Sequence, residues 1–361
     1  LLPTAPTRSE YDFLGWASTS GASTATWTSG TKTCTGNTTW YAVWKVVFAI
    51  YATINGENQK IGKYYPNASE QTINISYPST FTGTGGVLSS VAGVNELTST
   101  QIKIAGNTTG DITVTPLGYW IGTYSAGSPS DSVYDNDAHK YYSTGEVWSG
   151  YKYIQFNGTT TYDSYPMRWI IIGSGANDTS TYGTGGNINH DNLGSNQVLL
   201  LSEKTLFNRK FDTTSVYSGD WSLTTTDMLR TYLNADFLTS SGLSSYSSKI
   251  PSTSLTTAWS PNSNSSSTVQ TTTSCQIFLL ATNAGENNEL ASNTNYTGQN
   301  FIVEKYLGGY TLHNSSSNLK MFAFSGSEAS RWWLRSGQNS YSPFGAYYVY
   351  NYGYVDSYDV Y

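Results

Sequence analysis

The sequence predicts a β-rich α+β protein, and three observations carry that prediction. Short apolar segments of about five to eight residues either alternate with polar residues or form buried runs, and Gly, Asn, Pro and Ser separate them. The polar composition comes from Ser, Thr, Asn, Gly and Tyr, whereas charged residues make up only 12% of the chain. Residues 224–238 alone show a convincing helical pattern.

Residues 1–45 are predicted to form short aromatic strands separated by Gly, Ser and Thr turns. Three elements follow one another: PTAPTR from Pro3 to Arg8, YDFLGW from Tyr11 to Trp16, and WYAVW from Trp40 to Trp44. They resemble the P-x-x-P-T-R, G-Y-x-F-x-G-W and L-Y-A-x-W signature of the Listeria-Bacteroides repeat, also called the internalin B-type repeat. The resemblance covers the second half of a repeat, which implies that the first strand precedes Leu1 in a longer surface protein.

Residues 46–122 are predicted to form a small antiparallel β-domain with one solvated face. The segments VVFAIYATI, QTINISY, QIKIAG and DITVTPLGYW alternate in the manner of half-buried strands. Residues 123–144 are rich in Gly, Ser, Asp and Asn and are expected to form a linker or long loop.

Residues 145–361 are predicted to form a separate domain with buried strands. Near-continuous apolar runs at 167–173, 196–206 and 274–282 are typical of such strands. The helix within 224–238 is expected to start at Asp227. Its apolar face consists of Met228, Leu229, Tyr232, Leu233 and Phe237.

Five ordered motifs in this region carry a second resemblance. They are MRWI at 167–170, LLLS at 199–202, Trp221 followed by LRTYLN at 229–234, FLL at 278–280, and RWWLRS at 331–336. The order resembles a prokaryotic domain with the C-type lectin fold, in the branch that includes formylglycine-generating enzymes. The resemblance implies a C-terminal C-type lectin fold carried on N-terminal small β-modules. The family's closing G-V-R-P is absent here, which indicates a truncated last strand.

In a subset of these domains the segment after W-W-L-R-S is the variable region of a diversity-generating retroelement. Adenine-directed mutagenesis there samples Asn, Tyr, Ser, Asp, Phe, Ala and Gly, and residues 337–361 contain almost nothing else apart from valines. The resemblance therefore implies that this segment binds ligand. The predicted ligand-binding residues are Gln338, Asn339, Ser340, Tyr341, Ser342, Phe344, Tyr347, Tyr348, Tyr350, Asn351, Tyr352, Tyr354, Asp356, Ser357, Tyr358, Asp359 and Tyr361.

The residue pattern around the turn also predicts a binding surface in this segment. Asn351-Tyr352-Gly353 is a turn signal, because Gly tolerates the positive φ that a short hairpin needs. Val349 and Val355 would then share a buried face, whereas Tyr348, Tyr350 and Tyr354 would point into water. Exposed Tyr with Ser, Asn and Asp is typical of antibody paratopes, and replacing these three tyrosines by Ser is expected to leave stability nearly unchanged. An edge strand whose tyrosines pack on a neighbouring domain is the structural alternative.

The residues before this segment are expected to support it. Trp332, Trp333 and Leu334 are predicted to be core residues, since bulky aromatic side chains bury when they can. Arg335 is expected to pair with a carboxylate or to cap carbonyl groups beneath the site. Arg168 and Arg230 receive the same interpretation.

Several classes of chemistry find no support in the sequence. The net charge of −6 does not favour nucleic acid or an anionic membrane as a partner, and no apolar run reaches the length of a membrane span. No calcium-lectin triplet, nucleophile motif or metal-ligand spacing occurs, and Cys275 lies in an apolar segment. His139, His190 and His313 are expected to be surface loop residues.

We therefore expect a ligand-binding display protein without enzymatic activity, cofactor or metal. Its partner would be a surface ligand, most plausibly a protein, and its location extracellular, on a cell or virion surface. The alternative is a cell-surface adhesin or structural module with the same fold and no diversification.

Overall fold

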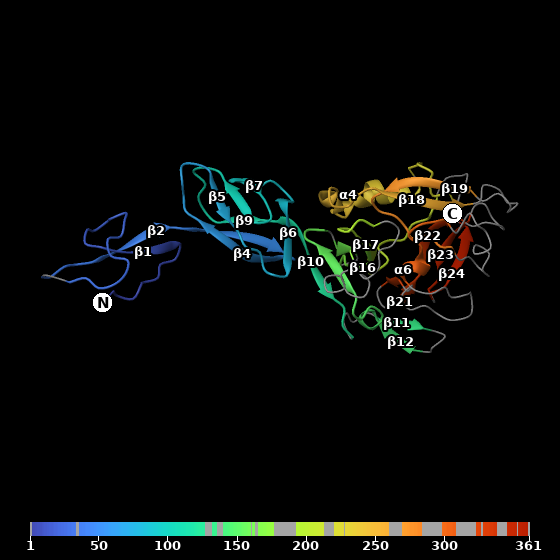
Figure 1. The fold of residues 1–361 in the computed structure, drawn as a ribbon, viewed down its shortest axis with the longest axis horizontal. Helices are drawn as coiled ribbons and strands as arrows, with labels where there is room; N and C mark the ends of the chain where they lie inside the picture. The colour runs from blue at the N-terminus through green and yellow to red at the C-terminus, as the bar shows by residue number, and fades with distance from the viewer. Residues whose placement is uncertain are drawn as a thin grey trace. The chain divides into compact units, whose positions relative to one another are not determined.

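The structure is a computed structural model, and the regular secondary structure of both compact units, Leu1–Tyr119 and Trp120–Tyr361, is mainly β-strand (Figure 1). The helices are short, so the predicted β-rich α+β class is confirmed. The structure describes residues 2–33, 36–126, 132–135, 140–159, 161–162, 165–176, 193–212, 220–226, 228–259, 269–283, 298–307, 323–325, 328–337, 345–351 and 353–359.

The first unit begins with a two-stranded antiparallel sheet of β1 (Tyr11–Ala17) and β2 (Tyr41–Val46). The register shifts at Gly15, whose φ of +131° and contact with the Trp27 carbonyl leave no room for a side chain. Trp27 is buried, and its backbone exchanges hydrogen bonds with that of Trp16. The aromatic strands predicted for this segment are present.

Two three-stranded sheets enclose the core of the rest of this unit. One has the order β4 (Glu57–Tyr64), β3 (Phe48–Ile54), β9 (Ile112–Val114), and the other β5 (Gln71–Asn74), β8 (Gln101–Ile104), β7 (Val94–Leu97). Ile50, Ile102 and Val114 are fully buried between them. The pairing is antiparallel except between β3 and β9, which run parallel because a long connection returns the chain to the same edge.

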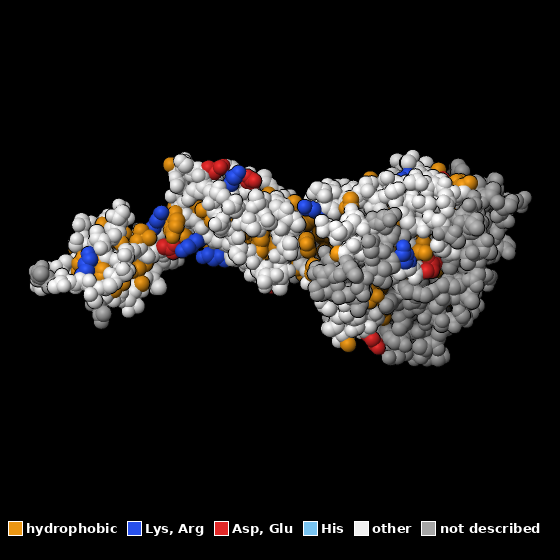
Figure 2. Space-filling model, in the orientation of Figure 1, with side chains coloured by type: hydrophobic (Ala, Val, Ile, Leu, Met, Phe, Trp, Pro, Cys, Tyr) orange, Lys and Arg blue, Asp and Glu red, His pale blue; other side chains and the backbone are white. Residues whose placement is uncertain are grey.

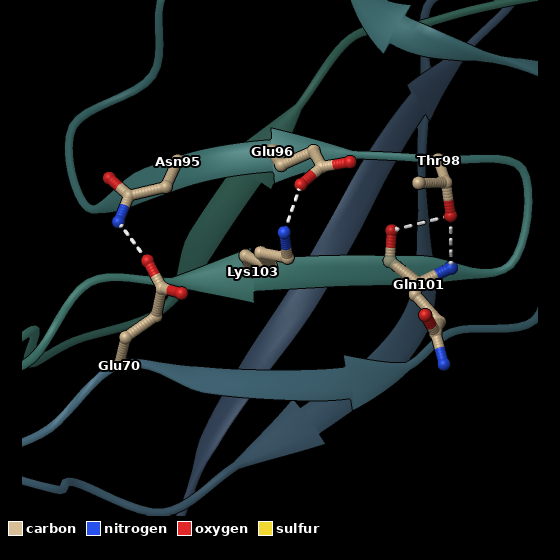
Figure 3. Close-up of polar contacts among 6 residues, drawn as sticks. All are labelled: Glu70, Asn95, Glu96, Thr98, Gln101 and Lys103. Atoms are coloured by element: carbon tan, nitrogen blue, oxygen red, sulfur yellow. Dashed lines mark hydrogen bonds and ion pairs between the residues drawn. The ribbon is translucent and has the colours of Figure 1, made fainter.

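The outer face of the β5–β8–β7 sheet is polar (Figure 3), and Figure 2 shows acidic and basic side chains close together on the surface over β5 and β7. Asn95 donates a hydrogen bond to Glu70 over 2.6 Å, and Lys103 forms an ion pair with Glu96. At the end of the β7–β8 turn the Thr98 hydroxyl accepts a hydrogen bond from the Gln101 backbone over 2.9 Å. The alternation of polar and buried positions along β8 confirms the predicted solvated face.

One carboxylate joins the first sheet to the module that follows. Only Val47 separates β2 from β3, and Asp12 Oδ2 accepts hydrogen bonds from Lys63 Nζ and Tyr65 Oη, each over 2.6 Å. These bonds from Lys63 and Tyr65 hold the pKa of Asp12 below its ordinary value. The bond with Asp12 raises the pKa of Lys63 in turn. Asp12 therefore fixes the junction through charge-assisted hydrogen bonds.

Two sheets and a helical segment form the centre of the second unit. One sheet of the second unit has the strand order β17 (Val198–Ser202), β16 (Trp169–Ser174), β13 (Lys152–Phe156), β10 (Pro116–Thr123). The strand β6 (Phe81–Val87) belongs to the first unit. A continuous helical segment consists of α3 (Leu229–Tyr232), the π-helical turn η2 (Leu233–Phe237) and α4 (Leu238–Ser240). The sheet β22–β23–β24 is described below.

Shorter elements surround this centre. They are the hairpins β11 (Ser132–Asp135) with β12 (Lys140–Ser143), β14 (Thr161–Tyr162) with β15 (Tyr165–Pro166), β18 (Thr253–Trp259) with β19 (Val269–Cys275), and β20 (Ala323–Ser325) with β21 (Glu328–Ser330), the helices α1 (Thr144–Val147) and α6 (Val303–Tyr306), and the 3-10 turn η3 (Leu243–Tyr246).

Most segments predicted in this unit are present, with two differences. Residues 274–282 were expected as a buried strand, but β19 ends at Cys275, and Leu280 and Ala281 are buried without forming a regular strand. Residues 123–144 were expected as a linker, but they contain β11 and β12, and Tyr124 is buried in the core beside Trp148. The Gly and Ser content that suggested a linker does not prevent an aromatic side chain from anchoring the segment.

The described residues of the second unit form two hydrophobic clusters. The first, which we call cluster one, includes Trp148, Ile170, Leu255 and Leu334, and the second, cluster two, includes Trp221 and residues of the helical segment such as Phe237. Of the predicted apolar face of the helix, Met228, Leu229, Leu233 and Phe237 are buried, and Tyr232 is half-buried against cluster two. The predicted start at Asp227 lies outside the described residues.

Candidate ligand-binding site

The candidate site is built on the antiparallel sheet β22 (Trp332–Gly337), β23 (Gly345–Val349) and β24 (Val355–Asp359), with β23 in the middle. The register places Trp333, Tyr348 and Asp356 side by side across the three strands. The neighbouring row, on the opposite face, contains Val349 and Val355. The predicted pairing of the two valines is thereby confirmed.

The hairpin between β23 and β24 forms as the turn signal predicts. Tyr350 N–H donates to the Tyr354 carbonyl over 2.8 Å, and Gly353 N–H donates to the Tyr350 carbonyl over 2.9 Å. Gly353 has a φ of +80°, the left-handed conformation that closes a three-residue loop. The turn therefore depends on glycine for its backbone conformation.

The sheet is buried on both faces along most of its length. Tyr347, Val349 and Val355 pack in cluster one, whereas Ala346 lies in cluster two. The ring of Tyr348 is only 5% exposed and makes an edge contact with Trp333, at 5.9 Å between ring centroids. The sheet thus separates the two clusters of the second unit.

This arrangement corrects the prediction that Tyr348 points into water. The prediction assigned its face correctly but assumed that the face was solvated. In the structure Ala346 on this face belongs to cluster two, and the Tyr348 ring packs against Trp333, which itself packs against that cluster. Tyr347, also predicted to contact ligand, is fully buried because it shares the Val349 face. Neither ring presents a surface to a partner in this structure.

The turn end of the sheet is different, and we call it the hairpin-end face. It consists of Arg331, Tyr350, Tyr354 and Asp356, on the same side of the sheet as Tyr348. Tyr350, Tyr354 and Asp356 are half-buried, and Arg331 is exposed. A guanidinium, a carboxylate and two phenol rings thus meet at one accessible edge.

The contacts within the hairpin-end face are specific. The rings of Tyr350 and Tyr354 stack with 13° between their planes and 5.1 Å between their centroids. The Arg331 guanidinium lies 4.3 Å from the centroid of the Tyr350 ring, within the range of a cation–π interaction. The Tyr348 hydroxyl donates to Asp356 Oδ2 over 3.0 Å. Burial, followed by the charge of Asp356, raises the pKa of Tyr348, so this hydroxyl stays protonated at neutral pH.

The remaining predicted site residues are placed only in part. Asn351 lies in the turn and is half-buried. Ser357, Tyr358 and Asp359 belong to β24, and the structure describes their backbone. The residues outside the described part of the chain are Gln338, Asn339, Ser340, Tyr341, Ser342, Phe344, Tyr352 and Tyr361. His139, His190 and His313 also lie outside it.

The residues before the hairpin form its support. Leu334 is fully buried, and Trp332 and Trp333 are partly buried against clusters one and two respectively. Trp333 Nε1 donates to the Arg209 carbonyl over 3.1 Å. The expectation of a core role is therefore confirmed for Leu334 and holds in part for the two tryptophans.

Arg335 is fully buried and binds oxygen atoms of three other segments. Its guanidinium donates to Thr257 Oγ1 over 3.0 Å, to the Leu279 carbonyl over 2.7 Å and to Asn300 Oδ1 over 3.0 Å, and it also contacts the Asn300 carbonyl. Of the two roles predicted for Arg335, the structure thus shows the capping of carbonyl groups. These bonds anchor β22 to the core beneath the site.

The two other arginines differ from each other. Arg230 caps the carbonyls of Ser222 and Leu223, with its closest donor 2.7 Å from the Ser222 oxygen. Arg168 instead faces the buried Glu203 at 3.8 Å. Each performs one of the two expected roles.

Sequence reasoning missed Arg331, the one cation of the hairpin-end face. Its position two residues before Trp333 was the available signal, because alternate positions share a face when a strand extends through them. It also missed the β18–β19 hairpin, whose Thr257 supports Arg335. The Thr-rich segments of β18 and β19 favour β-structure, but they lack the alternation of apolar and polar residues that identifies a strand from sequence.

The described residues hold no group of three or more His, Cys, Asp or Glu side chains that could ligate a metal ion. Among the helices described, none has the length and apolar content required to cross a membrane. The polar chemistry at the hairpin-end face is therefore that of hydrogen bonding, ring stacking and a single exposed guanidinium.

Two family models match the chain. The Listeria-Bacteroides repeat domain matches residues 1–43, in agreement with the resemblance noted for that segment. A domain of unknown function, DUF6273, matches residues 195–361, which include the whole β22–β24 sheet. No curated protein matches the chain, and no solved structure does. The chain thus carries a Listeria-Bacteroides repeat domain at its N-terminus and a DUF6273 domain in its C-terminal half.

Proposed function

We propose that this chain is a ligand-binding protein whose hairpin-end face contacts the ligand. One observation supports the proposal: half-exposed tyrosines and an exposed arginine lie at a turn whose flanking residues Val349 and Val355 are buried. We call Val349, Gly353 and Val355 the frame of the hairpin. Tyr and Arg are enriched among residues that dominate binding energy, and Tyr supplies contact area at low entropic cost. Such residues are available here without any loss of core packing.

The separation of frame from surface supports a display role. Val349 and Val355 are buried and Gly353 fixes the turn, whereas Tyr350 and Tyr354 remain accessible. Substitutions at accessible positions leave the frame intact, since surface changes usually alter stability by about 0.5 kcal/mol or less. The turn can therefore carry different side chains in different copies of the protein.

The finer form of the proposal is that residues 337–361 are the variable region of a diversity-generating retroelement, on a C-type lectin fold. Its support is the residue set of that segment, which is rich in Tyr, Asn, Ser and Asp. In this form the protein acts at an extracellular surface of a cell or virion, and its ligands are proteins. Burial of Tyr347 and Tyr348 restricts the positions that can vary freely to the turn and its flanks.

The binding experiment uses the complete chain, immobilised and screened against purified surface proteins from co-resident microbes. We expect a ligand that binds wild type with micromolar affinity or better and at least tenfold more weakly to a Tyr350→Ser, Tyr354→Ser double variant. Tyr41→Ser is the matched control, because Tyr41 is an exposed tyrosine of the N-terminal repeat, 41% accessible. Ligands that bind the double variant as well as wild type would place the binding surface elsewhere.

The second candidate is an adhesin with the same site and no diversification, favoured by the N-terminal repeat domain. The DNA that surrounds the coding sequence distinguishes these two candidate functions. Diversification predicts a near-identical template repeat with adenines at the Tyr, Asn, Ser and Asp codons, beside a reverse transcriptase gene. A genome that lacks both the template repeat and the reverse transcriptase gene would contradict diversification and favour the adhesin function.

A further inference from the structure

Arg331 precedes β22 and lies outside the segment expected to vary. It is exposed, and its guanidinium lies over two tyrosine rings, 4.3 Å from the centroid of Tyr350 and 5.6 Å from that of Tyr348. The side chain as a whole is exposed, and the two rings restrict the positions that its planar group can take. A guanidinium placed in this way has already lost much of its conformational freedom before a ligand arrives.

The charges around the hairpin set the chemistry that this arginine faces. From Glu328 to Tyr361 the sequence contains only two basic residues, Arg331 and Arg335. Arg335 is fully buried, and its donors are directed at Thr257, Leu279 and Asn300. A ligand at the turn can therefore reach only one of the two cations.

The nearest carboxylate of the face is already engaged. Asp356 Oδ2 accepts a hydrogen bond from the Tyr348 hydroxyl over 3.0 Å, so this carboxylate is already paired within its own sheet. Partial burial lowers the pKa of Arg331, but a side-chain hydrogen bond with Tyr350 and the nearby Tyr348 and Asp356 together raise it above the ordinary value. The guanidinium is thus charged at any pH at which the protein is folded.

We propose that the hairpin-end face selects protein ligands that present an Asp or Glu side chain to Arg331. This inference rests on the proposed function, and it adds the chemistry of the partner. The guanidinium can form a bidentate pair with a carboxylate, the geometry in which arginine is most selective. Tyr350 and Tyr354 then contact the apolar part of the ligand beside that carboxylate, as aromatic residues around an arginine anchor do at protein interfaces.

A displayed library of random peptides tests the proposal, with the complete chain as the target. Peptides that bind wild type and fail to bind the Tyr350→Ser, Tyr354→Ser double variant are defined as site ligands, and their sequences are counted. We expect Asp and Glu to be enriched among site ligands relative to the unselected library. We also expect Arg331→Gln to weaken the best acidic ligand by about tenfold or more, the usual effect of removing one charge-assisted hydrogen bond.

Two controls keep the result interpretable. Arg8→Gln removes a matched group, an exposed arginine 3.8 Å above the ring of Tyr11 in the other unit, and should leave binding unchanged. Arg331→Lys retains the charge without the planar fork, and its affinity should fall between those of wild type and Arg331→Gln. This series also keeps the test valid if Arg331→Gln lowers the unfolding temperature.

The outcomes separate the inference from the function on which it rests. Site ligands without acidic enrichment, and with equal affinity for Arg331→Gln, overturn the inference and leave the binding function standing. A library that yields no ligand sensitive to the tyrosine pair overturns the proposed function itself. Heparin and sialylated glycans are included as probes, and Arg331-dependent binding of these glycans without binding of acidic peptides overturns the choice of a protein partner.

Discussion

Replacing Tyr348 by Ala should destabilise the second unit far more than removing the two tyrosines at the turn. Tyr348 is 5% exposed and packs edge-on against Trp333. Truncating a buried aromatic ring to Ala costs about 3–5 kcal/mol. Tyr350→Ser with Tyr354→Ser should cost about 1–2 kcal/mol in total, from small solvent-face terms and one lost stacking contact.

Scanning calorimetry of the complete chain measures the difference. At about 2–4 °C per kcal/mol for a domain of this size, Tyr348→Ala should lower the unfolding temperature by roughly 10 °C and the double variant by roughly 3–6 °C. Tyr348→Phe keeps the ring and loses only the hydrogen bond to Asp356, so about 1 kcal/mol and roughly 3 °C are expected. Ile102→Ala, in the core of the first unit, identifies which transition belongs to which unit.

The reasoning is refuted if Tyr348→Ala shifts the transition no more than the double variant does. That result would mean that the Tyr348 ring contributes no packing and faces solvent, as the alternation in the sequence alone predicts. An unchanged transition for Tyr348→Phe would show only that the Asp356 contact is weak in solution.

Three further predictions concern stability. Because the pKa of Asp12 is lowered from its ordinary value of 3.8, its bond with Lys63 stabilises the folded chain above that pH, and this stabilisation is lost on acidification through the lower folded pKa. Asp12→Asn should flatten this part of the pH–stability curve by less than about 1 kcal/mol, as urea titrations between pH 2 and 6 would show. Gly353→Ala should cost about 1–2 kcal/mol by calorimetry and Gly353→Asn less, because Asn tolerates positive φ; equal effects would contradict the turn assignment. Arg335→Met should cost about 3–5 kcal/mol, since it leaves buried carbonyl groups without donors, and a neutral result in denaturant titration would show that they find other partners.

Local patterns in the sequence were sufficient for the aromatic strands of the first unit and for the hairpin between β23 and β24. The Tyr11–Trp16 motif and the Val349, Gly353, Val355 spacing each specify a backbone conformation through neighbouring residues alone. The family matches at residues 1–43 and 195–361 agree with where such local signals were strongest. Features of this kind can be predicted because their cause lies within a few residues of the chain.

The burial of Tyr347 and Tyr348 could not be predicted in the same way. Alternation shows which side chains share a face, but not whether another element covers that face. Tyr347 packs in cluster one with Trp148 and Ile170, which lie more than 170 positions away in the sequence, and only the tertiary fold brings them together. The position of Tyr347 on the Val349 face, by contrast, follows from the alternation of side chains along the strand alone.

The contacts of Arg335 have a consequence for the order in which the second unit is built during synthesis. Its guanidinium bonds to Thr257, Leu279 and Asn300, and β23 and β24 complete cluster one through Val349 and Val355. Until the ribosome has delivered these late strands, the surfaces that they cover remain open and the domain cannot close. A nascent chain stalled before Arg331 should therefore bind a hydrophobic dye such as ANS strongly and recruit chaperones, whereas one extended past β24 should not.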